Sequence, residues 1–265
     1  MKLIQSRDNP FFRELLKLTG SARRRNKSAQ TLLDGAHLLA ACLDAGHMPL
    51  HVLLNEAAFH NDEISALVQR MPGVRITQLD DRLYAELSEL KTPSGILALI
   101  DILLPATNIA DSSFALFLED IQDPGNLGSM LRSAAAAGCD AVILSEGCAD
   151  AWSPKVLRAG MGGHFVVAIH DSADLHVAAA HFRSRVFAAV PGASESLYDC
   201  DLRGRVAFAI GNEGAGISAG LLASCRPVTI PMPGNVESLN AAAAAAVCLF
   251  EYVRQRGLVS DASIP

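Results

Sequence analysis

The sequence predicts an α/β protein with mostly parallel sheets, and three observations support this fold class. Short apolar runs such as 114–118 and 206–210 have the length and composition of buried strands. Helical signals follow most of these runs, so strands and helices alternate along the chain. Half of the 265 residues are hydrophobic, which supplies a sizeable core. Alternation of this kind gives a parallel sheet covered by helices on both faces.

Residues 1–105 are predicted to form the first domain. Its first helix starts at the Asn9-Pro10 pair and runs to about Leu18, and the polar, basic segment 20–30 is expected to be mobile. The composition of 104–108 is typical of a linker, so we place a domain boundary near 104–112. The other predicted elements are strand 32–34, helix 36–45, strand 52–54, helix 62–71, strand 74–79, helix 80–90 and strand 96–102.

Residues 106–265 are predicted to form the second domain, with the same alternation. Gly138 closes its first helix, and Ser153 caps a later one with Pro154 at the first helical position. An alanine-rich helix is expected to start near Ser238. The other predicted elements are strand 114–118, helix 127–137, strand 141–144, helix 153–158, strand 166–169, helix 174–182, and strands 186–190, 206–210 and 228–230.

Composition argues against several classes of protein. No apolar run reaches the roughly 18 to 20 residues of a membrane span, and the N-terminus lacks the apolar core of a signal peptide. Six scattered cysteines form no CxxC pair, which is typical of reduced thiols rather than a disulfide framework or a zinc site. We therefore expect a cytoplasmic protein.

Basic charge is concentrated at the N-terminal end. The net formal charge is −6, whereas residues 1–30 carry eight basic and two acidic side chains, so this segment is +6 and the remainder is −12. A basic arm on an acidic body can contact a polyanion such as a nucleic acid, and Arg23, Arg24, Arg25 and Lys27 are the candidate contacts. The alternative is a solvated basic helix and loop.

Three loops carry the candidate chemistry, and the first follows strand 114–118. Arg132 can project toward the same end of the following helix as Asn126, where a guanidinium suits a phosphate. The alternative is that Asn126 only caps the helix and that Arg132 is an ordinary surface residue. The loop lacks the Gly-Lys-Ser/Thr ending of a P-loop.

The second and third loops follow strands 206–210 and 228–230. Loops at the carboxyl ends of parallel strands bind ligands, so these two suggest one shared site. The loop 211–216 reads GxxGxG rather than the dinucleotide fingerprint GxGxxG, and a carboxylate at Glu213 suits a hydroxyl, an amine or a structural clamp better than a phosphate. Glu213 could instead cap the next helix. The third loop brings Ser238 and Asn240 to the first turn of the alanine-rich helix.

Together, the motifs NLGSMLR, GNEGAGIS and IPMPGNVESLNAA resemble those of the SpoU (TrmH-like) ribose methyltransferases of the SPOUT class. Order, spacing and residue types agree over about residues 114–256. Residues 1–105, with the stretch LLDGAHLL, resemble the L30e-type substrate-binding domain often fused ahead of this catalytic domain. One departure is Ala242, which stands where the family often has a second serine.

This resemblance implies an L30e-like domain followed by an α/β domain with a deep trefoil knot near its C-terminal end. It also implies a homodimer that methylates a ribose 2′-hydroxyl in rRNA or tRNA, and the separate N-terminal domain favours rRNA. The cofactor would be S-adenosylmethionine, bound in the knot largely through backbone groups at Gly211, Ile230 and Leu239, with Met232 nearby. The positions that match the family's functional polar residues are Asn126, Arg132, Glu213, Ser238 and Asn240.

The residue types suit an in-line methyl transfer, in which positioning is a large part of catalysis. The motifs contain no histidine or cysteine base, and a guanidinium stays protonated in proteins, so Arg132 is a poor proton acceptor. We expect Arg132 to grip an RNA phosphate, with that phosphate or a water taking the proton; direct deprotonation through Arg132 is the alternative. Asn126 would orient Arg132 or the ribose, and no metal is required.

Two other classes stay open. One is a non-catalytic RNA-binding protein on the same fold, and the other is a small-molecule enzyme on a doubly wound sheet. Retention of all five polar positions argues against the first. The missing dinucleotide and P-loop motifs and the basic arm argue against the second.

Overall fold

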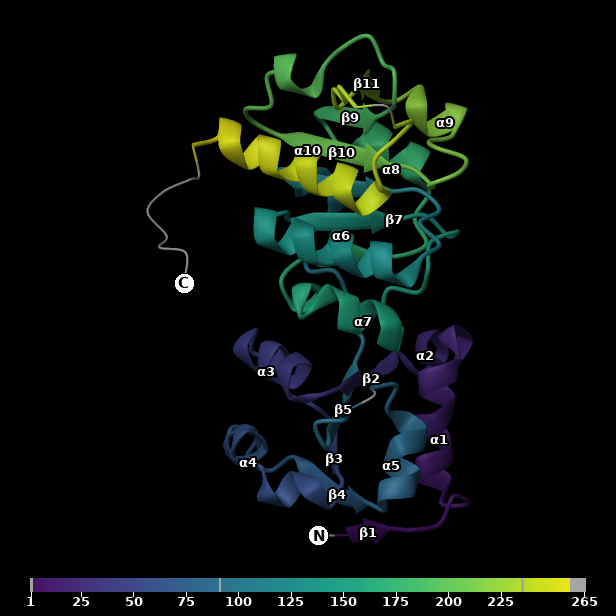
Figure 1. Ribbon diagram of the computed structural model, residues 1–265, viewed down its shortest axis with the longest axis vertical. Coiled ribbons are helices and arrows are strands. Elements are labelled where there is room, and N and C mark those ends of the chain that lie inside the picture. Colours follow the sequence, from purple (N-terminus) through teal and green to yellow (C-terminus); the bar gives the residue numbers. More distant parts are fainter. Residues whose placement is uncertain (1, 91, 235, 258–265) are drawn as a thin grey trace. The chain divides into compact units, whose positions relative to one another are not determined.

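The computed structural model describes residues 2–90, 92–234 and 236–257, so Asn235 of the third motif and the last residues of the predicted second domain, 258–265, lie outside it. The chain divides into two compact units (Figure 1). One comprises Met1–Leu103 and Trp152–Phe165, and the other comprises Leu104–Ala151 and Val166–Pro265. The sequence placed 152–165 in the second domain, whereas these residues pack with the first unit. In the described ranges no helix is long and apolar enough to cross a membrane.

The first unit contains a five-stranded mixed sheet in the order β1-β4-β3-β5-β2. Strands β1, β4 and β3 are mutually parallel, and β5 runs antiparallel to β3 and β2. The strands are β1 (Lys2–Ile4), β2 (Gln30–Asp34), β3 (His51–Leu54), β4 (Arg75–Leu79) and β5 (Ile96–Asp101). Their helices are α1 (Pro10–Gly20), α2 (Ala22–Ser28), α3 (Ala36–Asp44), α4 (Asp62–Gln69), α5 (Asp81–Leu87) and α7 (Pro154–Gly160), with 3-10 turns η1 (Ala57–His60) and η3 (Gly163–Phe165).

The basic segment 20–30 is ordered, so the expectation that it is mobile is wrong. Ser21 caps α2 by accepting a 3.2 Å hydrogen bond from the backbone N–H of Arg24. The helix then directs Arg25 inward, where its side chain is buried and its guanidinium donates to the carbonyls of Leu18 and Thr19 at the end of α1. Carbonyls at a helix C-terminus lack partners within the helix, so a buried cation satisfies them.

Helix α7 is capped as the sequence predicts. Ser153 accepts a hydrogen bond from the N–H of Val156, and Pro154 occupies the first turn. The residues before α7 are tied to the first unit, since the Thr31 hydroxyl donates 2.7 Å to the carbonyl of Trp152. Val156 and Leu157 are fully buried, and α7 packs against β2. Hydrophobic burial therefore assigns this helix to the first unit although it lies late in the chain.

The second unit contains a six-stranded parallel sheet in the order β11-β9-β10-β6-β7-β8, which confirms the predicted fold class. The strands are β6 (Phe114–Leu118), β7 (Ala141–Leu144), β8 (Ala168–His170), β9 (Arg185–Ala189), β10 (Val206–Ile210) and β11 (Arg226–Val228). The helices are α6 (Pro124–Ala137), α8 (Leu175–His181), α9 (Ala219–Leu222) and α10 (Ala241–Gln255), with 3-10 turns η2 (Ile109–Asp111) and η4 (Leu197–Asp199).

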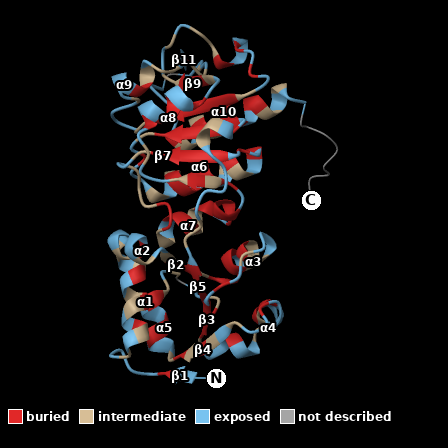
Figure 2. Cartoon of the chain, turned by 180° about the vertical axis from the view of Figure 1, so that it is seen from behind, coloured by how far each residue is buried: buried red, intermediate tan, exposed pale blue. Residues whose placement is uncertain are grey.

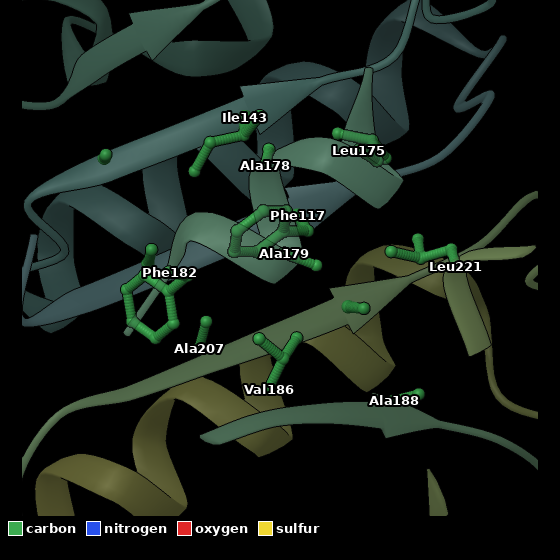
Figure 3. Close-up of a cluster of buried hydrophobic side chains, with 13 residues drawn as sticks. Phe117, Ile143, Leu175, Ala178, Ala179, Phe182, Val186, Ala188, Ala207 and Leu221 are labelled. Atoms are coloured by element: carbon green, nitrogen blue, oxygen red, sulfur yellow. The ribbon is translucent and has the colours of Figure 1, made fainter. Parts of the chain in front are cut away.

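Helices cover both faces of this sheet, and its central strands are buried (Figure 2). On one face, alternate residues of β6, β7, β9 and β10 pack against α8 and α9; Phe117 and Phe182 meet edge to face there, with ring centroids 5.9 Å apart (Figure 3). On the other face, Phe114 of β6 stacks on Tyr252 of α10 at 3.9 Å. The two-residue period of the strands sorts these side chains between the two faces.

Register in the centre of the sheet brings the first two motifs together. Strands β6 and β10 are neighbours, with Leu118 opposite Ile210, and the N–H of Glu119 continues the ladder by donating 2.9 Å to the carbonyl of Ile210. The loops that follow both strands therefore start side by side. The third loop is longer than predicted, because β11 ends at Val228 and α10 begins only at Ala241.

Candidate functional site

Residues of the second and third loops enclose a cavity of about 360 Å³ at the carboxyl ends of β9, β10 and β11. This volume lies within the roughly 300–1,000 Å³ typical of small-molecule sites. The predicted cofactor contacts Gly211, Ile230, Met232 and Leu239 all line it. Of the predicted polar residues, Glu213 and Ser238 line it as well.

The glycine loop of the second motif is folded tightly on itself. A Cβ on Gly211 would lie 2.2 Å from the carbonyl oxygen of Gly216, so only glycine fits there. The side-chain oxygen of Asn212 accepts hydrogen bonds from the N–H groups of Gly214 (2.8 Å) and Ala215 (3.0 Å). Asn212 was not among the predicted site residues, although a side chain that turns its own backbone is a familiar role of asparagine.

A chain of side-chain hydrogen bonds joins the three motifs. The amide nitrogen of Asn126 donates 2.6 Å to Oε1 of Glu213, and the amide nitrogen of Asn240 donates 3.0 Å to Oδ1 of Asn126. The three predicted residues are thus brought together from positions far apart in the sequence. Both ends of the Asn126 amide are used, so its orientation is fixed by its two neighbours.

Other residues cap helices α6 and α9, so the side chains of Asn126 and Glu213 can take part in the hydrogen-bonded chain. Asp123, not Asn126, caps α6 by accepting 2.7 Å from the N–H of Asn126. Ser218, not Glu213, caps α9. Asn240 is itself the cap of α10 and accepts from the N–H groups of Ala242 and Ala243, so it does not lie inside the helix as the predicted start near Ser238 implied.

Arg132 lies apart from this hydrogen-bonded chain. It is exposed on α6, it does not line the cavity, and its guanidinium has no hydrogen-bond or ion-pair partner within the described part of the chain. The structure therefore gathers Asn126, Glu213 and Asn240, with Ser238 at the cavity, and leaves Arg132 free to meet something outside this chain.

The cavity has an acidic lining. Glu213 and Glu237 both line it, and no lysine, arginine or histidine is among the described residues that line it. A carboxylate lining suits a ligand that carries positive charge, such as a sulfonium or an ammonium, and disfavours a phosphate. Glu237 was not predicted as a site residue. Among the described residues, no group of three or more histidine, cysteine, aspartate and glutamate side chains could hold a metal ion.

The predicted RNA contacts at the N-terminal end differ in exposure. Arg23 and Lys27 are exposed, and Arg24 is half-buried and pairs with Glu14. Arg25 is 4% exposed and bonded to backbone carbonyls, so it cannot reach a phosphate and its prediction as an RNA contact is wrong.

Residues 113–250 match the model of the SpoU rRNA Methylase family. The chain belongs to this family. Residues 9–98 match the model of the MRM3-like substrate binding domain. The predicted family and the prediction that the protein is an enzyme are therefore confirmed, and the small-molecule enzyme on a doubly wound sheet is excluded.

Members of this family in other organisms are similar over most of their length. The chain is 30% identical to 23S rRNA (guanosine(2553)-2′-O)-methyltransferase RlmP of Bacillus subtilis, covering 94% of this chain and 98% of that protein. A solved structure of an RNA 2′-O ribose methyltransferase is 30% identical, with a TM-score of 0.80, and the match covers 96% of this chain and 99% of that one. The AviRb methyltransferase of Streptomyces viridochromogenes in complex with AdoMet is 26% identical, with a TM-score of 0.82 over 94% and 98% of the two chains.

Proposed function

We propose that this SpoU-family enzyme transfers a methyl group from S-adenosylmethionine to a ribose 2′-hydroxyl of structured RNA, with rRNA as the favoured substrate. The observation that carries the proposal is the hydrogen-bonded chain Glu213–Asn126–Asn240, which joins all three motifs beside an acid-lined cavity. The rRNA assignment rests on the names of the relatives and on the substrate-binding domain matched by residues 9–98.

The cavity residues fit S-adenosylmethionine, which supplies an electrophilic methyl group on a positively charged sulfur. Ile230, Met232 and Leu239 offer apolar contacts, and the tight turn at Gly211 presents backbone groups. The carboxylates of Glu213 and Glu237 favour the positive charge. Neutral polar contacts and apolar walls of this kind fix the orientation of a small ligand.

Arg132 and Ser238 are assigned to the RNA. Ser238 is exposed and lines the cavity, so its hydroxyl can hydrogen-bond the ribose. The exposed guanidinium of Arg132 can hold a phosphate in a two-pronged contact and so place the 2′-oxygen in line with the methyl group. That phosphate or a water then takes the ribose proton. Asn126 holds Glu213 and Asn240 and thereby supports the cavity rather than contacting the ribose.

A second copy of the chain is proposed to cover the outer side of α10 and the third loop. Apolar side chains that do not line the cavity are exposed there, including Val236 (62%) and Phe250 (47%). Apolar surface of this kind is typical of a protein interface, and a dimer would bring another Arg132 into the assembly. The C-terminal trefoil knot and a cytoplasmic location are part of the same proposal; six unpaired cysteines are consistent with a reducing compartment.

The proposal is tested by incubating the purified protein with methyl-labelled S-adenosylmethionine and with rRNA or tRNA from cells that lack the protein. We expect label in rRNA at a site resistant to alkaline cleavage, because a 2′-O-methyl group removes the internal nucleophile. Label in tRNA alone would show that tRNA, not rRNA, is the substrate. Label on a base would exclude ribose methylation. An Asn126→Ala variant serves as the inactive control.

A further inference from the structure

The glycine loop 211–218 forms much of the cavity wall, but it has few side chains of its own to hold it in place. Gly211, Gly214 and Gly216 leave its backbone with more freedom in the unfolded chain than any other residue type would. The loop is nevertheless tied at both ends to two consecutive residues that follow β6, Glu119 and Asp120. Neither residue lines the cavity.

The C-terminal end of the loop is held by the side chain of Glu119. One carboxylate oxygen accepts 2.7 Å from the N–H of Ser218, and the other accepts 2.6 Å from the Ser218 hydroxyl. The same hydroxyl oxygen accepts a bond from the N–H of Leu221 and so caps α9. Glu119 is half-buried, and hydrogen bonds to a charged acceptor are stronger than neutral ones.

The N-terminal end of the loop is held by the backbone of Asp120. Its carbonyl accepts 2.9 Å from the side-chain amide of Asn212, whose oxygen in turn holds Gly214 and Ala215. Asp120 adopts φ +54°, a left-handed conformation that is uncommon for a residue with a Cβ. A backbone strained in this way persists only where its surroundings impose it.

Ser145 holds Asp120 in this conformation. The Ser145 hydroxyl donates 2.6 Å to the Asp120 carboxylate and accepts 2.8 Å from the Asp120 N–H. The carboxylate occupies space left by Gly147, where a Cβ would lie 2.2 Å from it. With this turn, two adjacent residues reach the two ends of one loop: Glu119 with its side chain and Asp120 with its carbonyl.

We infer that Glu119 and Asp120 form a latch that pre-organises the glycine loop for the cofactor, and that Glu119 is a positioning residue acting through Ser218. The inference rests on the proposed function in that the cavity is taken to bind S-adenosylmethionine. A loop held in its bound conformation avoids an ordering cost on binding, so the latch raises cofactor affinity without contacting the cofactor.

The experiment compares the wild type with Glu119→Ala, Glu119→Gln, Ser218→Ala and the double variant Glu119→Ala/Ser218→Ala. Backbone amide hydrogen exchange at 214–216, S-adenosylmethionine affinity by calorimetry, and KM and kcat for the cofactor are measured. We expect Glu119→Ala to speed exchange in the loop and to raise Kd and KM about tenfold, the size expected for a lost charge-assisted hydrogen bond, with kcat within about twofold. The effects of the two single changes on Kd should be less than additive in the double variant, because both remove the contact between the Ser218 hydroxyl and the Glu119 carboxylate.

Asp201→Asn is the matched control, since it alters an exposed carboxylate that pairs with Arg203 in the same unit. If Glu119→Ala fails to fold, the same measurements on Glu119→Gln test the latch, because glutamine keeps the side-chain volume and one acceptor oxygen but removes the charge. Unchanged loop exchange in the Glu119 variants would overturn the latch, as would a lower melting temperature with unchanged Kd. Absence of S-adenosylmethionine binding by the wild type would instead overturn the proposed function, while the exchange measurement would still decide the latch.

Discussion

The amide of Asn126 lies 2.6 Å from Oε1 of Glu213, and this hydrogen bond joins the start of α6 to the glycine loop after β10. A donor at this position is required, because a carboxylate accepts hydrogen bonds but cannot donate them when ionised. The same amide accepts a bond from Asn240 at the cap of α10. One neutral side chain therefore sets the spacing of three loops.

Replacing Asn126 by aspartate should abolish this arrangement. The new carboxylate would face Glu213 at hydrogen-bond distance, where like charges repel. We expect single-turnover methylation to fall at least about 100-fold, a loss of about 2.7 kcal/mol in transition-state stabilisation. Asn108→Asp is the control, because Asn108 uses only its side-chain oxygen, as the cap of η2, and aspartate keeps that acceptor. Wild-type turnover in Asn126→Asp would remove the amide from the mechanism.

Arg132 is expected to act on the RNA and not on the fold. Arg132→Ala should lose activity while S-adenosylmethionine affinity and melting temperature stay near wild type, since the guanidinium has no partner in the described ranges. Arg132→Lys should rescue little, because lysine keeps the charge but not the planar fork. Melting temperature, cofactor affinity and single-turnover methylation are measured for the three proteins. An Arg132→Ala enzyme that methylates RNA at the wild-type rate would contradict the assignment.

Gly211 should not tolerate any side chain. A methyl group there would overlap the backbone of Gly216 and Ile217, at 2.2 and 2.6 Å, so the loop must shift. We expect Gly211→Ala to lose cofactor binding and to destabilise the protein by about 1–3 kcal/mol, as overpacking does. Gly220→Ala is the matched control, because its nearest neighbour would be 3.9 Å away. Calorimetry and thermal unfolding distinguish the two; equal affinities would show that the loop adapts.

The basic segment should separate into RNA-binding and structural arginines. The double variant Arg23→Ala/Lys27→Ala removes two exposed charges and should weaken RNA binding with a smaller salt dependence, by about 1.4–1.8 in the slope of log K against log salt, if both contact phosphates. Arg25→Ala should instead lower stability by about 1–3 kcal/mol, because it leaves carbonyls of α1 unpaired. Unchanged RNA affinity of the double variant at matched salt would exclude this segment as an RNA contact.

Protonation of His51 should weaken the first unit at acid pH. Burial, reinforced by the charge of Arg75, lowers the pKa of His51 below its usual 6.5, and the ring lies 2.8 Å from the Thr77 hydroxyl. A lowered pKa in the folded state means that the unfolded state binds the proton first, so stability is full above about pH 6.5 and falls as the pH decreases below it. His51→Gln should lose stability less steeply between pH 7.5 and 5. Parallel pH profiles of melting temperature for the two proteins would refute this role.

Strand positions in the second unit were determined by local sequence. The runs 114–118, 141–144 and 206–210 are strands β6, β7 and β10 with the predicted ends, because apolar runs of four or five residues are typical of strands in a sheet that is covered on both faces. The cap at Ser153 was predictable for a similar reason, since a serine side chain accepts from an N–H of the first turn and the proline that follows has no N–H to satisfy. Four predicted cofactor contacts line one cavity, because the second and third motifs follow strands whose carboxyl ends lie at the same edge of the sheet.

Other features were decided by pairing between distant residues. The polarity of segment 20–30 predicted a mobile basic arm. In the structure the buried Arg25 guanidinium donates to carbonyls at the end of α1, and these hydrogen bonds hold α2 against the first unit. Trp152–Phe165 were assigned by sequence order to the second domain, whereas α7 buries its apolar face against β2.

The functional site also combines features set by local sequence with features set by pairing between distant residues. The sequence by itself determined the family, the three loops and most of their polar residues, because strand patterns and motif spacing are local properties. Only the tertiary structure decided that Asn126 serves Glu213 and Asn240, and that Glu119 and Asp120 hold the glycine loop. A hydrogen bond between residues 87 to 114 positions apart depends on which strands are neighbours, and no local pattern encodes that adjacency.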